Sequence, residues 1–477
     1  MSLAHPDDHD SSNMTRAAAD APADMTIMER IYRGVVEEID AGVLLPGQRL
    51  PSVRTMSARH RVSRDTIVRA YDKLIANGQA YAVRGAGFYV REATPADRPI
   101  TTPAVLPPLD PSRLIHSDHP LDRTPGSGIL RHEESAQAEV AKVARAVTAA
   151  IGSDGTYGNP LGYLPLRQAL CDKLKGEGIE VPLDQLVTTP GAVAGLSLVI
   201  RALLRPGTSV LYERPCSFIH LQVLMAQGAS GIGVPRQADG PDLEALRTLC
   251  ERHRPYLFLL SSVLHNPTGT SIAPHKVHKL LEIAAEFDLL LVDDASYADL
   301  LPTGPGTYAA APLMRFGGLR RVIHVGGFSH TIAPAVAPGF VVADESRMQF
   351  IRYFRPIQGL GNTIIQERLL YRFLHEGLYR RRCDRVRAHL ARCSMGLRRT
   401  ITDIGLPFAV PPAGGLFLWG SLGDGIDATE VATRMLARTY LTAPAVHFTR
   451  YADLRSYMRF NVTTTNANTL AALANCL

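Results

Sequence analysis

The chain of 477 residues has little of what marks secreted, metal-binding or membrane-spanning proteins. Its six cysteines form no CxxC pair and no metal-ligand spacing, which favours reduced thiols over disulfides or a zinc site. No uninterrupted apolar run reaches the ~18 residues that a membrane span requires. Lysine is scarce, and none follows Lys279, so the rest of the chain has no side-chain primary amine. These absences predict a cytoplasmic protein without disulfides, bound metal or a membrane anchor.

What is present describes a globular protein of several domains. Hydrophobic residues make up 46% and charged residues 20% of the chain, and its length predicts two or three domains. Residues 1–24 contain five aspartates and no apolar core, so we expect a disordered tail and not a signal peptide.

Residues 25–92 carry the pattern of a winged helix-turn-helix. Apolar residues recur every fourth position from Ile27 to Ile39, which predicts an amphipathic helix. Ser52 and Ser63 are good N-cap residues for a second and a third helix. Two short strands, at 80–83 and 88–90, enclose the glycine-rich tip 84–87.

The same stretch resembles the GntR family of bacterial transcription regulators. The likeness rests on Leu45–Arg54, Val62–Ile67 and Gly78–Val90, and the module holds +4 of the net charge of +6, with eleven Lys/Arg against seven Asp/Glu. The resemblance implies binding to a double-stranded DNA operator, with the start of the third helix in the major groove and the wing along the backbone. The alternative is an ordinary solvated basic face. The expected DNA-binding residues are Arg49, Ser52, Arg54, Ser63, Arg64, Asp65, Thr66, Arg84, Gly85 and Gly87.

A proline-rich linker is expected at 93–130, before a large α/β domain at 131–477. Beyond the linker, short apolar runs alternate with helical segments, which predicts a mostly parallel sheet covered on both faces. Ligands of such sheets gather at the carboxyl ends of the strands. The expected strands are 209–212, 256–260, 289–292, 321–324 and 339–342.

Motifs at these strand ends resemble the class I/II aminotransferases of fold type I. The motifs are Tyr157–Gly162, Thr188–Val193, His265–Gly269, Asp293–Tyr297, Pro412–Trp419 and Tyr457–Asn461. With the winged helix in front, the chain looks like a MocR-type member of the GntR family. The resemblance implies a multidomain protein: an α+β winged helix, an aminotransferase-like large α/β domain and a smaller C-terminal α+β subdomain. The implied pocket residues are Tyr157, Gly191, Ala192, Asn266, Asp294, Tyr297, His330 and Arg459.

Four positions depart from the aminotransferase pattern. His330 stands where the family has the lysine that binds pyridoxal phosphate covalently, and an imidazole cannot form that bond. Ala337 and Gly327 replace phosphate-binding side chains, and Val193 replaces a polar residue in the phosphate loop. We therefore expect no covalent cofactor and no enzyme activity; pyridoxal phosphate is expected at most as a weak non-covalent ligand.

The retained residues allow two interpretations each. Asn266 and Tyr297 can contact a ligand or stabilise a turn and a buried hydrogen-bond network. Arg459 can bind a substrate-like carboxylate or pair with an acid of the protein itself. His330 can be a core histidine or a pH-sensitive hydrogen-bonding group.

The sequence thus predicts a sequence-specific DNA-binding regulator. By resemblance it is a homodimer in which Tyr157 reaches the pocket of the partner. The aminotransferase-like domain is expected to sense a carboxylate-bearing small molecule through Arg459. The alternatives are an active aminotransferase, a regulator that binds pyridoxal phosphate non-covalently, and a dimerisation scaffold without a small-molecule ligand.

Overall fold

The structure is a computed structural model that describes residues 26–40, 44, 47–77, 79–83, 87–91, 110–116, 118–150, 159–302, 310–358, 364–403 and 414–477. The chain divides into two compact units, Met1–Leu106 and Pro107–Leu477. The predicted tail at 1–24 lies outside the described residues. Each unit is considered by itself.

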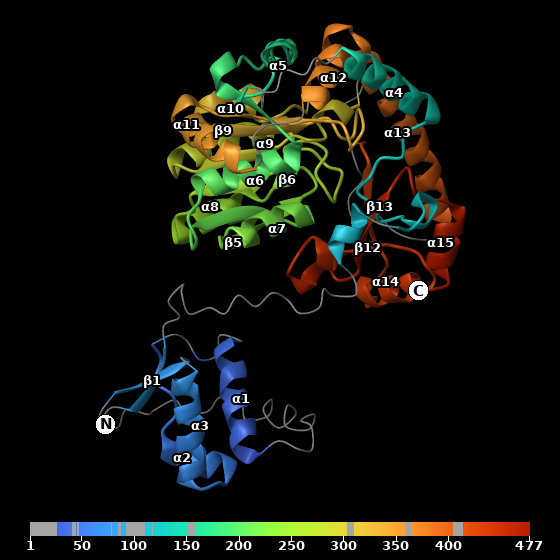
Figure 1. Cartoon of the computed structure of the whole chain (residues 1–477). Coiled ribbons are helices and arrows are strands. Elements are labelled where there is room, and N and C mark those ends of the chain that lie inside the picture. The colour runs from blue at the N-terminus through green and yellow to red at the C-terminus, as the bar shows by residue number, and fades with distance from the viewer. Residues whose placement is uncertain are drawn as a thin grey trace. The chain divides into compact units, whose positions relative to one another are not determined.

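The first unit is a winged helix-turn-helix, as predicted. Its helices are α1 (Ile27–Asp40), α2 (Val53–His60) and α3 (Arg64–Ala76), and its hairpin consists of β1 (Ala80–Val83) and β2 (Gly87–Val90) (Figure 1). α3 occupies the centre because Ile67, Tyr71 and Leu74 are completely buried. The Tyr71 hydroxyl donates a hydrogen bond to Pro51 O at 2.8 Å, which fixes α3 against the start of α2.

The wing contains a third extended segment that the sequence pattern did not indicate. Residues 47–50 run along β2: Leu50 N–H donates to Phe88 O at 2.8 Å, and Val90 N–H donates to Gln48 O at 2.9 Å. The segment before α2 is therefore hydrogen-bonded to the wing. Residues 84–86 at the tip lie outside the described part of the chain.

An eight-stranded sheet forms the middle of the larger unit. Its strand order is β3-β10-β9-β8-β7-β4-β5-β6. The central strands β9, β8, β7, β4 and β5 are parallel, whereas β10 runs antiparallel to both neighbours and β6 is antiparallel to β5. The bounds are β3 Leu186–Thr189, β4 Ser209–Arg214, β5 Ser230–Gln237, β6 Gly240–Pro241, β7 Leu257–Leu260, β8 Leu290–Asp294, β9 Val322–Gly327 and β10 Gly339–Val342. The sheet is mixed, because the predicted strand at 339–342 is antiparallel.

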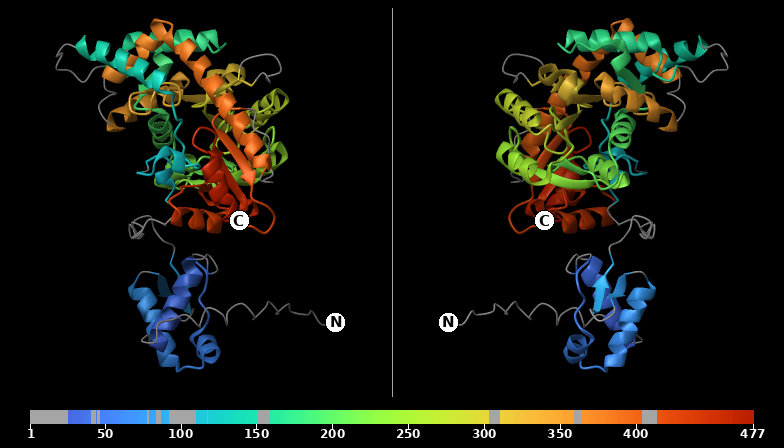
Figure 2. Two further views of the ribbon diagram at one scale, coloured as in Figure 1. Left: turned by 90° about the vertical axis from the view of Figure 1, so that its right-hand side faces the viewer. Right: turned by 90° about the vertical axis from the view of Figure 1, so that its left-hand side faces the viewer.

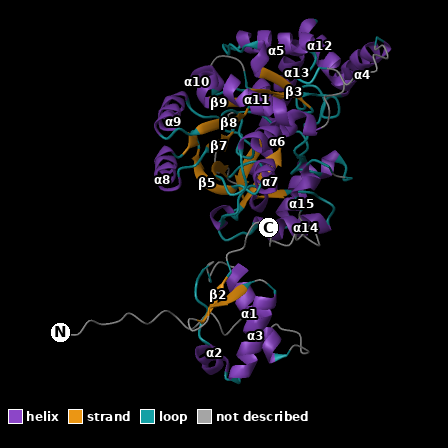
Figure 3. Cartoon of the chain, turned by 60° about the vertical axis from the view of Figure 1, so that its left-hand side comes forward, coloured by secondary structure: helices purple, strands orange, loops and turns teal. Residues whose placement is uncertain are grey.

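Helices cover both faces of this sheet (Figure 3). Alternate strand residues enter two separate cores: Leu257 and Leu259 pack on one face, and Phe258 and Leu260 on the other. α6 (Ala192–Leu203), α7 (Phe218–Ala226) and α11 (Glu345–Phe354) cover the first face. The second face carries α4 (Glu134–Ala149), α5 (Leu164–Gly176), α8 (Leu243–His253), α9 (Pro274–Glu286), α10 (Met314–Arg321) and α12 (Ile364–His375).

The smaller C-terminal subdomain is an α+β layer, as predicted. Its sheet has the order β11-β13-β12, with β11 at Phe417–Ser421, β12 at Ala443–Pro444 and β13 at Tyr457–Asn461. α14 (Ala428–Ala437) and α15 (Ala467–Ala474) pack on it. The long helix α13 (Leu378–Asp403), orange in Figure 2, runs from the large sheet's helices to this layer.

The described residues 110–116 and 118–130 belong to the larger unit, although a linker was predicted at 93–130. Leu114 is buried, and Asn461 N–H donates to Pro125 O at 2.8 Å. Gly126 fits so tightly that an added Cβ would lie 2.5 Å from the backbone of residues 442 and 443. This segment is held by partners more than 300 residues away, which local composition cannot indicate.

Short 3-10 helices complete the fold. They are η1 Pro111–Leu114, η2 Leu121–Arg123, η3 Leu183–Gln185, η4 Ala298–Leu300, η5 Arg355–Gln358, η6 Ala445–His447 and η7 Ala452–Leu454. In the described part of the chain, no helix has the length and apolarity that a membrane span requires. Nor do three His, Cys, Asp or Glu residues of this part gather where they could hold a metal ion.

Candidate functional site

The start of α3 is an exposed polar surface built on a capped helix. The Ser63 side chain accepts a hydrogen bond from Thr66 N–H at 3.2 Å, which satisfies one of the open N–H groups of the first turn. Arg64 and Asp65 point to solvent, and Asp65 pairs with Arg69 at 3.1 Å one turn later. Arg64 is therefore the cation that the first turn of α3 presents to a partner.

α2 begins in the same way. Ser52 accepts from Thr55 N–H at 3.1 Å, and Arg54 is exposed in the first turn. Arg49 is exposed too and lies under the wing: a Cβ added at Gly87 would be 3.1 Å from Arg49 Nε. Gly87 has a φ of 113°, which L side chains avoid, so its backbone conformation favours glycine there. Of the predicted DNA-binding residues, Arg84 and Gly85 lie outside the described residues.

In the larger unit, an acid stands at the end of β8. Asp294 Oδ2 lies 2.9 Å from His220 Nε2, and Asp294 Oδ1 accepts from Ser296 N–H at 3.1 Å. Burial alone would raise the pKa of Asp294, but the hydrogen bond and charge of His220, with the bonds from Ser296, hold it below its ordinary value. The carboxylate is thus kept ionised. His220 lies 74 residues away in sequence, and no spacing in the chain pointed to it.

Arg459 and Asn266 form the next part of the site. Arg459 is 1% exposed; its Nη1 donates to Asn266 Oδ1 at 2.8 Å, and its Nη2 donates to Gly126 O at 2.6 Å. Phe417 and Phe448 face the guanidinium at 4.2 and 4.8 Å from their ring centres. No described carboxylate lies within ion-pair distance of Arg459, and its buried Nε has no partner there. The cation is therefore buried without an anion, and burial lowers its pKa to about 10.

His330 lies flat against Tyr297. Their rings are stacked with centres 4.5 Å apart and an interplanar angle of 22°. Burial raises the pKa of Tyr297, which a hydrogen bond from Asn266 opposes. Burial lowers the pKa of His330 to about 4, so the imidazole is neutral at pH 7. The structure thus joins the buried Tyr297, Asn266 and Arg459 with the half-buried His330 and, through electrostatic contact, Asp294 in one cluster.

The backbone after His330 is hydrogen-bonded to side chains of α13. No motif in the sequence predicted these contacts. Arg382 is 1% exposed and donates to Thr331 O, to Ile332 O at 2.6 Å and to Ala136 O at 2.8 Å. The Tyr379 hydroxyl lies 3.0 Å from the Thr331 hydroxyl. The loop that carries residue 330 is therefore fixed by the first turns of α13.

Gly191 and Ala192 begin α6, opposite the carboxyl end of β9. The N-terminus of a helix of this length presents N–H groups and a partial positive charge to an anion. Ala192 leaves no room beside it, since a Cβ added at Gly327 would lie 2.8 Å from the Ala192 Cβ. Ala337, which stands where the resemblance predicts a phosphate-binding arginine, is buried and cannot donate a hydrogen bond from its side chain. An anion here would rely on backbone donors.

The side chains of this cluster fit the pyridine ring of pyridoxal phosphate better than they fit its phosphate group or its covalent attachment. Asp294 suits a pyridine nitrogen, and Asn266 and Tyr297 suit a phenolic oxygen. The side chain at 330 is an imidazole, however, and the buried Lys173 is paired with Glu177 at 2.6 Å and Asp299 at 2.9 Å. Covalent attachment therefore has no suitable amine in the described cluster. Tyr157, the remaining predicted pocket residue, lies outside the described residues.

Four histidines, of which His324 and His447 are buried and His132 and His330 half-buried, should make stability depend on pH. Burial lowers the pKa of His132, His324, His330 and His447 to about 4 from an ordinary 6.5. Between these values the unfolded chain binds protons that the folded chain does not, so the free energy of unfolding should fall as the pH falls through this window. A depression from 6.5 to about 4 corresponds to roughly 3 kcal/mol for one fully buried group.

Urea unfolding between pH 7.5 and 4.5 measures this effect. His330→Phe keeps a ring against Tyr297 and removes one titrating group, so its stability should depend on pH less steeply. Equal pH dependence in the variant and the wild type would show that residue 330 does not contribute.

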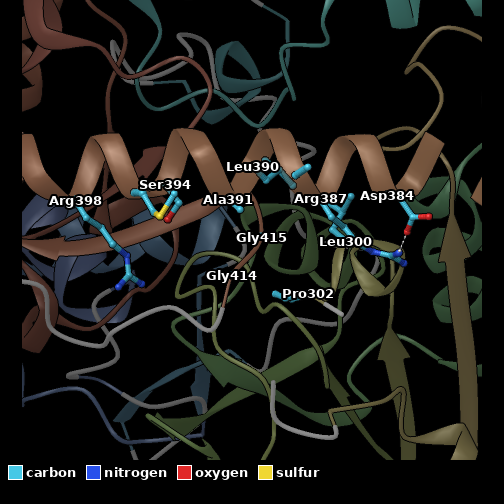
Figure 4. Close-up of a pocket in the computed structure, with 12 residues that line it drawn as sticks. Leu300, Pro302, Asp384, Arg387, Leu390, Ala391, Ser394, Arg398, Gly414 and Gly415 are labelled. Carbon is cyan, nitrogen blue, oxygen red and sulfur yellow. Dashed lines mark hydrogen bonds and ion pairs between the residues drawn. The ribbon is translucent and has the colours of Figure 1, made fainter. Parts of the chain in front are cut away.

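A separate groove of about 570 Å³ lies along α13. Figure 4 shows Arg387 and Arg398 along the helix, with Gly414, Gly415 and Pro302 on the opposite wall. Arg387 pairs with Asp384 at 2.9 Å and so fills part of its own hydrogen-bonding capacity. The cluster around His330 shares no lining residue with this groove.

Comparison with known proteins matches each unit to a family. Residues 126–477 match the family Aminotransferase class I and II, and residues 27–90 match the bacterial regulatory proteins of the gntR family. The two matches follow the division of the chain into two units.

Regulators with both parts are similar to nearly the whole chain. The uncharacterized HTH-type transcriptional regulator YdfD of Bacillus subtilis is 26% identical over 435 residues, which cover 86% of this chain and 88% of YdfD. The HTH-type pyridoxine biosynthesis transcriptional regulator PdxR of Corynebacterium glutamicum is 28% identical over 412 residues, covering 84% and 85%.

Among solved structures, the multiple substrate aminotransferase of Thermococcus profundus resembles the larger unit. It aligns with a TM-score of 0.68 at 22% identity and covers 76% of this chain and 92% of its own. At this identity the likeness shows a shared fold.

Proposed function

The chain belongs to the class I and II aminotransferase family and joins that fold to a gntR-family domain, as MocR-type regulators do. From this premise we propose that it is a sequence-specific transcription regulator whose larger domain senses a small molecule without catalysis. Two observations support the proposal. The first turn of α3 presents Arg64 on a capped, exposed surface. The cluster has an imidazole at residue 330, the position at which the family resemblance predicts the reactive lysine.

Recognition of the operator follows from the geometry of α3. A recognition helix enters the major groove with its N-terminal residues against the base edges, and arginine can bond guanine there through two hydrogen bonds. Arg49, Arg54 and the glycine-rich wing would bind phosphates beside it. The winged helix is thus the part that reads the DNA sequence.

Arg64→Ala should weaken operator binding by about 1–3 kcal/mol and relax the preference for one base position. The operator is first obtained by selection from a random duplex library with the full chain, and binding is then measured by fluorescence anisotropy. Arg33→Ala, at an exposed arginine of α1, is the matched control and should bind as the wild type does. Equal affinity and equal base preference for Arg64→Ala and the wild type would contradict the assigned role of α3.

The absence of catalysis rests on the side chain at 330. Transamination by this family runs through a primary amine that holds the cofactor, and an imidazole lacks it. Pyridoxal phosphate bound without a covalent link is a second ligand candidate, because Asp294 with His220, and Asn266 with Tyr297, remain in position. An active aminotransferase is the rival function: the retained Asp294, Asn266 and Tyr297 support it, and the imidazole at residue 330 opposes it.

The effector is proposed to carry a carboxylate. A buried guanidinium is costly without an anion, and the neutral partners Asn266 and Gly126 leave the Nε of Arg459 unpaired among the described residues. A carboxylate would supply the missing charge. Its binding would act on the DNA-binding unit only to the extent that it favours one state of the protein over another.

Arg459→Ala should weaken the binding of such an effector at least tenfold. Isothermal calorimetry with a panel of amino acids and dicarboxylates identifies a ligand of the wild type, and the variant should bind it at least tenfold more weakly. Arg455→Ala, at an exposed arginine near β13, is the control for general charge effects. Thermal unfolding shows whether Arg459→Ala still folds; equal affinities of a folded variant and the wild type would remove Arg459 from the effector site.

The homodimer is proposed to form through an apolar surface of the larger unit. Val193, Phe350, Tyr353 and Ile357 are exposed by 52%, 50%, 76% and 61%, on the mutually contacting elements α6, α11 and η5. Large apolar side chains gathered on neighbouring elements favour contact with another protein surface. In such a dimer two winged helices would read two half-sites. We expect this regulator to act in the cytoplasm, where its DNA target lies.

A further inference from the structure

Helix α13 carries many more basic than acidic side chains. Its 26 residues contain eight arginines and only two aspartates. Arginine outnumbers lysine throughout this chain, so the type of residue says little. The informative feature is that the acids needed to balance these cations are missing from the helix itself.

Four of the arginines form one exposed row. Arg381, Arg385, Arg392 and Arg399 follow one another at steps of four, seven and seven residues and are all exposed. At 100° per residue they lie within about 40° of one another, along roughly 27 Å of helix. The buried residues Val386, Leu390, Leu397 and Ile401 instead anchor α13 in the core of the smaller subdomain. We call these four exposed arginines the arginine row.

The neighbouring helix balances only part of this charge. Arg385 pairs with Glu139 at 2.5 Å and Arg392 with Glu133 at 2.9 Å; their side chains remain 52% and 62% exposed. Among the side chains that the structure describes, the ion pairs of the α13 arginines are made by Arg382, Arg385, Arg387 and Arg392, and none by Arg381 or Arg399. Exposed ion pairs contribute little, about 0–1 kcal/mol, so a stronger anion can replace the two glutamates.

We propose that the arginine row binds the phosphate backbone of double-stranded DNA beside the operator. This inference rests on the proposed function, which brings DNA to the protein through the winged helix. A regular row of exposed guanidinium groups over ~27 Å matches a polyanion of repeating charge, since one DNA strand advances 3.4 Å per nucleotide. Beside the arginine row, α13 exposes one large apolar side chain, Met395. This surface therefore lacks the aromatic and apolar anchors that a folded protein partner would need.

The number of residues between the two units is compatible with this contact. Residues 92–109 separate the last described residue of the winged helix from the first of the larger unit. Eighteen residues reach about 60 Å at most when fully extended. This length of chain is enough for one duplex to contact a winged helix and an arginine row.

The test measures how salt affects DNA binding. Full-length protein is titrated against a 40-base-pair duplex of random sequence, by fluorescence anisotropy at 50–200 mM NaCl. Arg381→Gln, Arg392→Gln and Arg399→Gln are combined in one variant. Loss of three phosphate contacts should reduce the slope of log Kobs against log salt by about 2.7, so the wild type should lose about 40-fold more affinity than the variant over this range.

The control variant combines Arg205→Gln, Arg252→Gln and Arg434→Gln, which remove three exposed arginines outside α13. It should keep the wild-type slope. Glutamine suits a helix surface, and circular dichroism shows that both variants fold. If the variant with the three arginine substitutions in α13 kept the wild-type slope, the proposal would be overturned. This would hold even if that variant bound another polyanion, such as polyglutamate or an anionic vesicle, more weakly than the wild type does.

Failure of this inference is distinguishable from failure of the proposed function. Sequence preference depends on Arg64 in the winged helix, whereas the salt slope attributed here depends on α13. Suppose that the wild type showed no preferred operator but that the α13 variant had a smaller slope of log Kobs against log salt. The proposed function would then be wrong, and DNA binding by the arginine row would still be supported. A preferred operator together with an unchanged slope would mean that the arginine row fails and the proposed function stands.

Discussion

Replacing Arg236 with methionine should lower the free energy of unfolding by about 3–5 kcal/mol, because it leaves a carboxylate buried without its counter-charge. Arg236 and Glu213 form an ion pair whose side chains are 0% exposed. They stand on the parallel neighbours β5 and β4. Methionine has a similar length and no charge, so the variant isolates the loss of the pair from the loss of volume.

The same pair holds the turn that carries Asn266. Arg236 donates to Thr270 O at 3.3 Å and to the Thr270 hydroxyl at 3.2 Å, while Glu213 Oε2 accepts from Ser261 N–H at 2.8 Å. The residues before and after the turn are thus fixed to one buried ion pair. We expect the variant to lose effector affinity together with stability, since Asn266 would no longer be held in place.

Burial already raises the pKa of Glu213, and Arg236 opposes that rise. Without Arg236 the carboxyl should bind a proton more readily in the folded state. A raised folded-state pKa makes stability increase as the pH falls, so the difference between variant and wild type should be smaller at pH 5 than at pH 7.5.

Urea unfolding at the two pH values measures both effects. The matched control is Arg247→Met, which breaks the solvent-exposed Arg247–Glu286 pair, 44% and 48% exposed, and should lower the free energy of unfolding far less than Arg236→Met does. A loss at Arg236 no larger than that of the control would show that the buried pair contributes nothing.

Local signals in the sequence were sufficient for the caps and the strand positions. Ser52 and Ser63 bond to N–H groups three residues ahead, so their role depends on neighbours in sequence. The apolar runs at 209–212 and 289–292 became strands because a run buried on both faces suits the centre of a sheet. The winged helix and the large α/β domain were predicted on this basis, whereas the smaller subdomain was predicted from the resemblance to aminotransferases.

Partners that are distant in sequence decided the rest. The direction of β10 depends on the path of the chain between two strands, which an apolar run does not encode. The packing of Gly126 depends on residues 442 and 443, and His220 meets Asp294 across 74 residues. The candidate residues could be named from motifs, but their buried contacts with one another could not.

Replacing His330 with lysine should give a chain that retains pyridoxal phosphate after borohydride reduction and desalting, close to one per protomer, whereas the wild type should retain none. The reason lies in the groups already placed around residue 330. Tyr297 stacks on the present imidazole, and Asp294 is held ionised by His220. A lysine at this position would add the one functional group that covalent attachment requires.

The absorbance spectrum and the mass of the modified peptide measure the outcome. His330→Met, of similar length but without an amine, should behave as the wild type does. Lys173→Arg in the lysine variant shows whether the adduct forms at residue 330 or at the buried Lys173, whose salt bridges keep it protonated.

Two results would count against the assignment of this cluster. A reducible adduct on the wild type would mean that another amine reaches the cofactor, and the protein could then be an enzyme. A folded His330→Lys variant that still retains none would mean that residue 330 does not face the cofactor ring or that the backbone donors at Gly191 and Ala192 hold the phosphate too weakly. The first result contradicts the non-catalytic function, and the second contradicts the equivalence of residue 330 with the family's lysine; only retention confined to the lysine variant supports both.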